Sequence, residues 1–214
     1  MKVFVAGANG QIGRHIMKLL KDSDDYTGIA MVRSKEQAEA FSEKGMEAVL
    51  ADLEGSVDEL AEAMKGCDAV VFTAGSGGHT GADKTLLIDL DGAVKTVEAA
   101  ELANVNRFIM VSAFQANNRE NWNEKIKHYY AAKHYADKAL LQSGLTYTIV
   151  RPGGLVNEPG TGKVSAGEKT ERDIIPREDV AKAVVACLKE EHTHNKSFDL
   201  VSGDTPIEEA LKRI

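Results

Sequence analysis

The sequence is poor in cysteine, in long apolar runs and in positive charge. Its two cysteines, Cys67 and Cys187, lie far apart, which predicts two free thiols in a reducing compartment rather than a disulfide framework. No apolar run reaches the roughly 18 residues that a membrane-spanning helix needs, so we expect no membrane partner. Lys and Arg total 26 against 33 Asp and Glu, and the net charge of −7 argues against general nucleic-acid binding.

The chain also shows no internal repeat, low-complexity segment or inter-domain linker. Its 214 residues can form one hydrophobic core, so we predict a single domain over residues 1–214. Met1-Lys2 is followed at once by Val-Phe-Val-Ala, which is typical of a strand and not of a secretory signal. The expected location is therefore the cytoplasm.

Short β-branched, apolar runs alternate with helix-forming stretches over most of the chain. Several of these runs show no polar alternation, as is typical of parallel strands buried on both faces. The predicted strands are Lys2–Ala6, Thr27–Val32, Ala48–Leu50, Ala69–Thr73, Phe108–Val111 and Thr146–Val150. The predicted helices are Gln11–Lys21, Lys35–Lys44, Val57–Met64, Lys84–Ala103 and Ile126–Gln142. This order predicts an α/β fold with a doubly wound, Rossmann-like parallel sheet and helices on both faces.

The pattern becomes less regular after the sixth predicted strand. The stretch from Gly153 to Arg172 is rich in glycine and proline and predicts a long loop, with a short strand near Lys163–Ser165. Within it, Glu158–Gly162 reads as turns that lead to a lid. A helix, a strand and a last helix are predicted at Arg177–Lys189, Ser197–Val201 and Pro206–Lys212. We therefore expect a small C-terminal substrate lobe built from loops.

A glycine-rich turn joins the first predicted strand to the first helix. The segment Gly7-Ala8-Asn9-Gly10-Gln11-Ile12-Gly13 has the spacing G-x-x-G-x-x-G. Glycines permit a tight turn and close approach of the backbone to a pyrophosphate, while the helix N-terminus offers free N–H groups. We interpret the segment as the binding loop of a dinucleotide cofactor. The alternative is a tight turn with no ligand.

The end of the second strand bears on the choice of cofactor. An acidic residue there would hold the ribose 2′-hydroxyl of NAD, but this sequence has Arg33 and Ser34. Arg33 can hold a 2′-phosphate through its fork of donors, Ser34 can add a hydroxyl, and Arg14 is a second candidate cation. The position favours NADP over NAD. The alternative is a solvated arginine at a strand end.

Two further strand ends supply candidate cofactor contacts. Asp52 and Leu53 follow the third strand, where the carboxylate could accept from the adenine amino group and Leu53 could pack on the ring. Asp52 could equally be a helix cap, because Gly55-Ser56 follows it. Ala74 and Gly75 follow the fourth strand and are small enough to let the ribose and phosphates lie against it.

Tyr129 and Lys133 form a Y-x-x-x-K pattern, which places both side chains on one face of a helix. A nearby ammonium lowers the pKa of a phenol and makes it a usable acid or base near neutral pH. Ser112 directly follows the fifth strand and could hold a substrate oxygen. The alternative is a packing helix with a surface lysine, and this is the reading we prefer for Tyr130, His134 and Tyr135.

Together with Ile149-Val150-Arg151-Pro152-Gly153, these motifs resemble the short-chain dehydrogenase/reductase superfamily, above all its short, atypical members with epimerase or dehydratase names. The resemblance covers nearly the whole chain. It implies that Tyr129 is the general acid/base, Lys133 its pKa partner and a ribose ligand, and Ser112 the holder of the substrate carbonyl. It also implies that the Pro152-Gly153 backbone approaches the nicotinamide carboxamide.

One position departs from this family's pattern. Asp89 stands where the family usually has an asparagine, and a carboxylate cannot replace the amide donor of the usual proton relay. The chain is also too short to hold most of the C-terminal lobe that sugar-nucleotide epimerases use. We therefore expect a small substrate.

The sequence thus predicts an NADP-dependent oxidoreductase that transfers a hydride to or from a small carbonyl or alcohol. The alternatives are an NAD(P)-dependent epimerase or dehydratase, and a non-catalytic NADP(H)-binding sensor.

No metal site is expected, because His192-Thr193-His194 lies in a polar stretch without a third ligand. The segment Asn117–Asn123 could form a substrate wall or a partner surface. Helices of the wider family often pair subunits, so the protein could form a homo-oligomer.

Overall fold

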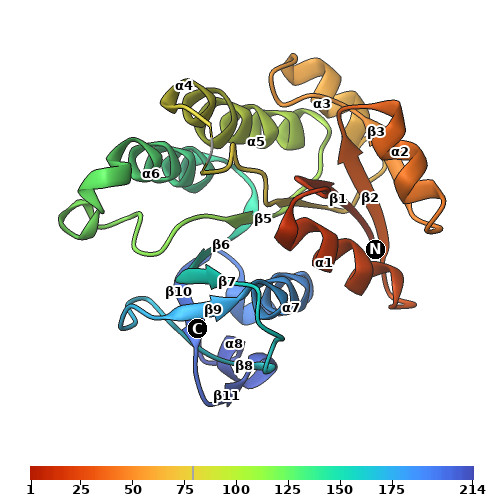
Figure 1. Ribbon diagram of the computed structural model, residues 1–214. Helices are drawn as coiled ribbons and strands as arrows, with labels where there is room; N and C mark the ends of the chain where they lie inside the picture. Colours follow the sequence, from red (N-terminus) through yellow and green to blue (C-terminus); the bar gives the residue numbers. More distant parts are fainter. Residues whose placement is uncertain (79) are drawn as a thin grey trace.

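A nine-stranded sheet in the order β11-β8-β10-β6-β5-β4-β1-β2-β3 runs through the computed structural model, which describes residues 1–78 and 80–214 (Figure 1). His79, which the sequence pattern places in a loop after the fourth strand, lies outside the described residues. The parallel strands are β1 (Lys2–Ala6), β2 (Thr27–Val32), β3 (Glu47–Leu50), β4 (Ala69–Phe72), β5 (Arg107–Val111), β6 (Thr146–Pro152) and β10 (Lys196–Ser202). Their order reverses between β1 and β4, and ligands of such sheets bind at this switch point.

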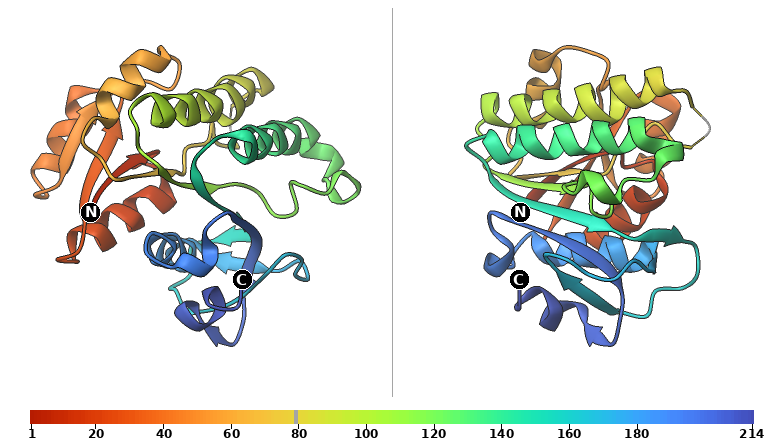
Figure 2. Two further views of the ribbon diagram at one scale, coloured as in Figure 1. Left: turned by 180° about the vertical axis from the view of Figure 1, so that it is seen from behind. Right: turned by 90° about the vertical axis from the view of Figure 1, so that its left-hand side faces the viewer.

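Helices cover both faces of the sheet, as Figures 1 and 2 show. Along β1, Val3 and Val5 belong to one hydrophobic cluster and Phe4 and Ala6 to the other, because successive strand residues point to opposite faces. The first cluster includes α1 (Gln11–Lys21), α2 (Lys35–Ser42), α7 (Arg177–Cys187) and α8 (Ile207–Leu211). The second includes α3 (Val57–Met64), α5 (Ala93–Leu102) and α6 (Lys127–Gln142). The predicted doubly wound, Rossmann-like α/β fold is confirmed.

The long helix predicted at Lys84–Ala103 is present but not uniform. It consists of α4 (Ala82–Lys84), a π-helical segment η1 (Thr85–Gly92) and α5. π-Helical turns inside α-helices are rare and frequently occur at functional sites. The segment η1 carries Asp89 and packs against α6, which carries Tyr129 and Lys133.

The C-terminal lobe contains more strand than the sequence predicts, so the prediction of a loop-built lobe is partly wrong. β7 (Gly154–Val156) and β9 (Ile174–Pro176) form a parallel pair of their own. β8 (Lys163–Gly167) pairs antiparallel with β10, and β11 (Thr205–Pro206) pairs with β8. Strands of two or three residues are too short to show a hydrophobic period, and their partner strands fix their positions. Short 3-10 turns complete the chain at Arg119–Asn121, Glu124–Ile126 and Glu191–Thr193.

Both cysteines carry free thiols, as predicted. Cys187 is buried at the end of α7, and burial raises the pKa of its thiol to about 12. Across residues 1–78 and 80–214, no helix has the length and apolar character needed to cross a membrane.

Gly13 permits the closest backbone contact of the glycine-rich turn. A Cβ atom on Gly13 would lie 2.1 Å from the Gly7 carbonyl oxygen and 2.8 Å from the Ala8 Cα. We expect Gly13→Ala to lower the free energy of unfolding by about 2–4 kcal/mol, because rigid backbone atoms would have to move. Urea denaturation measures the change. Gly78→Ala is the matched control, because a Cβ there meets no atom of residues 1–78 or 80–214 within 4 Å; equal stability of the two variants would contradict the prediction.

Candidate functional site

The glycine-rich turn lies directly against the end of β4. Gly7 has a φ of +89°, and a Cβ atom there would lie 2.5 Å from the Ala74 nitrogen. The Gly10 N–H donates to the Gly7 carbonyl oxygen at 2.9 Å. The turn and the Ala74-Gly75 segment therefore form one surface at the switch point of the sheet.

The N-terminus of α1 is left open to a ligand. Gly10 is its N-cap residue, its first turn contains no acidic residue, and within the described part of the chain no side chain caps it. By contrast, Ser56 caps α3, and α7 has two acidic residues in its first turn. The free N–H groups and the helix dipole make the N-terminus of α1 suited to a phosphate.

Some of the other side chains of the turn are exposed to solvent and one is buried in the core. Asn9 and Gln11 are exposed, and Ile12 is buried in the first hydrophobic cluster. The Arg14 guanidinium donates to Asn9 Oδ1 from Nε at 3.2 Å and from Nη2 at 2.9 Å. Arg14 is therefore already held by the turn.

Arg33 and Ser34 differ in how their side chains are used. Arg33 is exposed, and its guanidinium forms no hydrogen bond or ion pair with another residue in 1–78 or 80–214. The Ser34 hydroxyl accepts from the Gln37 N–H at 3.3 Å and caps α2. It also hydrogen-bonds Glu36 and lowers the pKa of that carboxyl. Arg33 is therefore the side chain available to a phosphate at this strand end.

The helix-cap interpretation of Asp52 is wrong. Ser56 caps α3 through a reciprocal capping box with Glu59. Asp52 is exposed, and its Oδ1 accepts from the Glu54 N–H at 3.0 Å. Leu53 is buried in the second hydrophobic cluster, against Gly92 of the segment η1.

Lys133 is buried, so the surface-lysine alternative is wrong. The side chain is 2% exposed, and its Nζ donates to the Val111 carbonyl oxygen at 2.9 Å. Nζ also lies 5.6 Å from the centre of the Phe72 ring. The ammonium is thus fixed at the ends of β4 and β5, beside the half-buried Tyr129 on the same helix face.

In the structure, burial rather than Lys133 dominates the pKa of Tyr129. Burial raises the pKa of Tyr129 above its usual value, and the negative charge of Asp89 raises it further. Burial likewise lowers the pKa of Lys133, although Asp89 and Asp137 oppose this shift. Desolvation and two carboxylates therefore outweigh the attraction that the Y-x-x-x-K spacing predicts.

A buried ion pair lies beneath these residues, and sequence reasoning missed it. Arg151 Nε donates to Asp137 Oδ2 at 3.0 Å, with both side chains almost fully buried. The Ser112 hydroxyl lies beside this carboxylate and lowers its pKa, while burial, the larger effect, raises it. Asp137 stands four residues after Lys133 and eight after Tyr129, so the helix period was the signal that could have revealed it.

The Ser112 hydroxyl lies at the carboxyl edge of the sheet, beside the Asp137 carboxylate. Ser112 is buried, and its N–H donates to the Val150 carbonyl oxygen at 2.8 Å. Its Oγ has no well-formed hydrogen bond to any residue that the structure describes. A substrate oxygen could complete this unsatisfied group.

Asp89 lies between the segment after β4 and α6, the helix that carries Tyr129 and Lys133. It is almost fully buried, and its Oδ2 accepts from the Ser76 N–H at 3.0 Å. A Cβ on Gly75 would lie 3.0 Å from Asp89 Oδ1, so the small residue permits this approach. The carboxylate also acts electrostatically on Lys133 and Tyr129. The structure therefore brings Asp89, Tyr129, Lys133 and Ser112 together.

The structure explains the presence of Pro152 and Gly153 without a cofactor. Pro152 is buried, and the Gly153 N–H donates to the Leu200 carbonyl oxygen at 2.9 Å. A Cβ on Gly153 would lie 2.1 Å from the Asp173 carbonyl oxygen. The glycine is therefore required for contact with the segment before β9, whether or not a nicotinamide approaches it.

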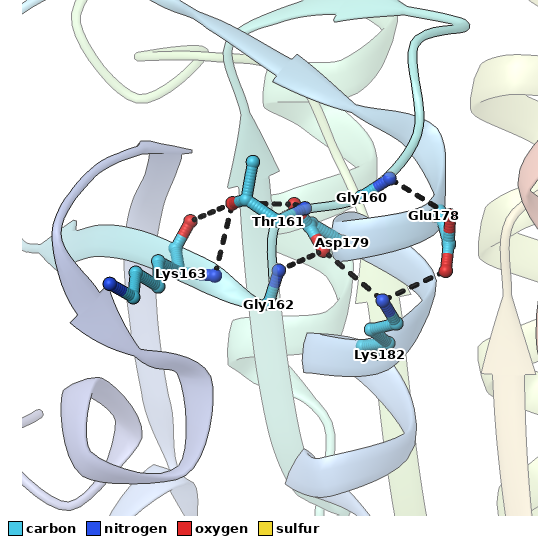
Figure 3. Close-up of polar contacts among 7 residues, drawn as sticks. All are labelled: Gly160, Thr161, Gly162, Lys163, Glu178, Asp179 and Lys182. Carbon is cyan, nitrogen blue, oxygen red and sulfur yellow. Dashed lines mark hydrogen bonds and ion pairs between the residues drawn. The ribbon is translucent and has the colours of Figure 1, made fainter.

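The segment expected to lead to a lid is tied to α7, as Figure 3 shows. The buried Asp179 accepts from the N–H groups of Thr161 and Gly162 at 2.7 and 2.9 Å. Glu178 accepts from the Gly160 N–H at 2.9 Å, and Lys182 lies 2.8 Å from Glu178 and 3.6 Å from Asp179. These charge-assisted bonds make the loop an anchored turn.

The remaining aromatic residues of α6 only partly follow expectation. Tyr130 and His134 are buried, as a packing role predicts. The ring of Trp122 stacks on that of Tyr130, with 6.2 Å between the ring centroids. Tyr135 is 48% exposed, so the prediction that it packs in the interior is wrong, and its hydroxyl accepts a hydrogen bond from Arg119 at 3.0 Å.

Among the described residues, no group of three His, Cys, Asp or Glu could hold a metal ion.

Comparison with known proteins identifies the family. Residues 7–191 match the family described as NAD(P)H-binding. The chain belongs to this family. It is 64% identical over 214 residues, all of both chains, to a Bacillus subtilis member named uncharacterized sugar epimerase YhfK. The turn, the open N-terminus of α1 and the small residues after β4 thus belong to an NAD(P)H-binding protein.

Solved structures agree with this assignment. A protein from Bacillus halodurans, named as a candidate NAD-dependent epimerase/dehydratase, is 43% identical with a TM-score of 0.93, and the match covers 100% of both chains. The oxidoreductase ylbE from Lactococcus lactis is 34% identical with a TM-score of 0.92, over 100% of this chain and 96% of that one. Proteins similar to this chain thus carry both epimerase and oxidoreductase names.

The raised pKa of Tyr129 has a spectroscopic consequence. A phenol ionises near pH 10 in water and then absorbs at longer wavelength. We expect Tyr129 to stay protonated through that range, because burial and Asp89 disfavour the phenolate. Wild type and Tyr129→Phe should therefore give the same phenolate absorbance up to about pH 10.5. A phenolate absorbance that is larger in wild type than in Tyr129→Phe by the contribution of one tyrosine would contradict the raised pKa. Tyr135→Phe, which removes an exposed tyrosine, is the control.

Proposed function

We propose that the protein is an NADP-dependent reductase of a small carbonyl compound, in which Tyr129 donates the proton. The observation that supports it most is the series of neighbouring residues that leads from the glycine-rich turn to α6. Gly7 lies against Ala74, the next residue, Gly75, lies against Asp89, and Asp89 acts on Tyr129 and Lys133. A dinucleotide on the turn would therefore have its reactive end beside these side chains.

The glycine-rich turn and the end of β2 would together hold a dinucleotide with a 2′-phosphate. Residues Gly7–Gly13 and the N-terminus of α1 would hold the pyrophosphate, and Arg33 the 2′-phosphate. Asp52 would accept from the adenine amino group, and the backbone of Pro152 and Gly153 would face the carboxamide. When bound, the cofactor supplies the hydride.

The protonated phenol favours reduction. A carbonyl oxygen gains negative charge as the carbonyl carbon is reduced, and the Tyr129 hydroxyl is placed to donate a proton to it. Ser112 would hold the same oxygen with its hydroxyl. Lys133, flanked by two carboxylates, would stabilise the phenolate left behind and hold the ribose. The buried Asp137–Arg151 pair would keep α6 in register with the sheet.

The second candidate function is epimerisation or dehydration by transient oxidation. It is favoured by the name of the 64% identical relative, an uncharacterized sugar epimerase. Turnover of a sugar without net consumption of NADPH would support this function over reduction. A third possibility, a non-catalytic NADP(H) sensor, requires that removal of the Tyr129 hydroxyl change no activity.

Arg33 offers the test of cofactor choice. Arg33→Ala removes the charged partner of the 2′-phosphate, so the Kd for NADPH should rise about 10–100-fold, while the Kd for NADH changes little. Calorimetric titration with both cofactors measures the ratio. Arg213→Ala, at the far end of the chain, is the control. Equal losses for NADPH and NADH, or no loss, would refute the 2′-phosphate role.

Tyr129→Phe tests the chemistry. Loss of the proton donor should lower kcat for NADPH-dependent carbonyl reduction by about 10²–10⁴-fold and leave NADPH affinity within about twofold. Steady-state kinetics across a panel of small aldehydes and ketones, with Tyr135→Phe as the matched control, measures the effect. If wild type binds NADPH but reduces none of them, and Tyr129→Phe behaves identically in every assay, the reductase function is wrong.

A further inference from the structure

A hollow beside the Ser112 edge is lined by Phe114, Gln115, Asn121 and Arg172, with a volume of about 260 Å³. Gln115 follows Ser112 by three residues, so the hollow continues the carboxyl edge where the candidate catalytic groups lie. Asn121 belongs to the segment Asn117–Asn123. Its presence in the lining favours the substrate-wall interpretation of that segment.

Arg172 is held in place without a carboxylate partner. Its guanidinium carbon lies 4.9 Å from the centre of the Phe114 ring, and one Nη donates to the Asn121 carbonyl oxygen at 3.4 Å. Within the part of the chain that the structure describes, Arg172 forms no ion pair. A guanidinium has five N–H donors, so most of them remain free for a ligand.

The other polar groups of the hollow are already bonded to one another. The Gln115 side chain donates to the Thr170 carbonyl oxygen at 3.3 Å and accepts from the Asn121 amide. The Gln115 N–H donates to the buried Asp199 at 3.2 Å. Asp199 is not part of the lining, and Arg151, its register partner in β6, offsets its charge. The free donors of the hollow therefore come from Arg172.

We propose that Arg172 and its hollow form a subsite for an anionic group, a carboxylate or a phosphate, on the substrate. This rests on the proposed function and narrows the substrate to a small carbonyl compound that carries an acidic group. A planar fork of donors matches the oxygen pairs of carboxylate and phosphate. In a chain of net charge −7, which repels anions in general, a fixed arginine is needed to hold such a group.

The protein contains one tryptophan, which gives a direct probe of this subsite. Trp122 follows Asn121, and its indole N–H donates to the Ala116 carbonyl oxygen at 3.1 Å. The experiment titrates the protein with succinate, inorganic phosphate and neutral succinamide, and follows both Trp122 fluorescence and calorimetric heat. We expect saturable binding of succinate, phosphate or both, and none of succinamide. The anion that binds more tightly shows whether the acidic group of the substrate is a carboxylate or a phosphate.

Arg172→Gln should weaken that binding at least tenfold, whereas Arg213→Gln should leave it unchanged. Circular dichroism melts of both variants check that they are folded. Three results would overturn the subsite: no saturable signal in either measurement, equal binding of succinamide, or equal binding by wild type and Arg172→Gln.

NADPH affinity, measured in parallel, separates this proposal from the proposed function. Arg172→Gln should bind NADPH as wild type does, because the cofactor turn is untouched. If wild type fails to bind NADPH but still binds the anion through Arg172, the reductase function is wrong and the anion site remains. If NADPH binds and the anion does not, only the subsite is wrong.

Discussion

The ion pair between Arg151 and Asp137 holds the candidate site together. Arg151 lies in β6 and Asp137 in α6, so their 3.0 Å contact attaches the helix that carries Tyr129 and Lys133 to the sheet. Both side chains are almost fully buried, and removing one partner of such a pair typically costs about 3–5 kcal/mol, because the other charge stays buried. The position of the phenol and the ammonium therefore depends on an interaction that neither of them makes.

The same carboxyl edge shows how charges and backbone contacts combine. The glycine turn approaches β4 because Gly7 has no side chain, and the loop after β4 approaches Asp89 because Gly75 has none. Asp89 then acts on Lys133, which is already fixed by the Val111 carbonyl. The absence of a side chain at these two glycines thus lets the uncapped N-terminus of α1 and the buried Lys133 lie at the same edge of the sheet.

The electrostatics of this edge also shape the chemistry that it can perform. A tyrosine whose pKa is raised stays protonated near neutral pH, so its hydroxyl still carries the proton that an oxygen needs as it becomes negative during reaction. Arg172, outside this buried group, is a cation without a carboxylate partner among the residues described. Under the proposed function, the buried charges would belong to the reacting part of this edge and Arg172 to the part that binds the substrate.

Residue spacing was enough to predict the glycine turn, the parallel α/β order and the shared face of Tyr129 and Lys133, because these features follow from the periods of strands and helices. It did not determine the burial of Lys133, the raised pKa of Tyr129, the Asp137–Arg151 pair or the strands of the C-terminal lobe. Those depend on desolvation and on contacts between segments far apart in the chain, which only the tertiary structure brings together.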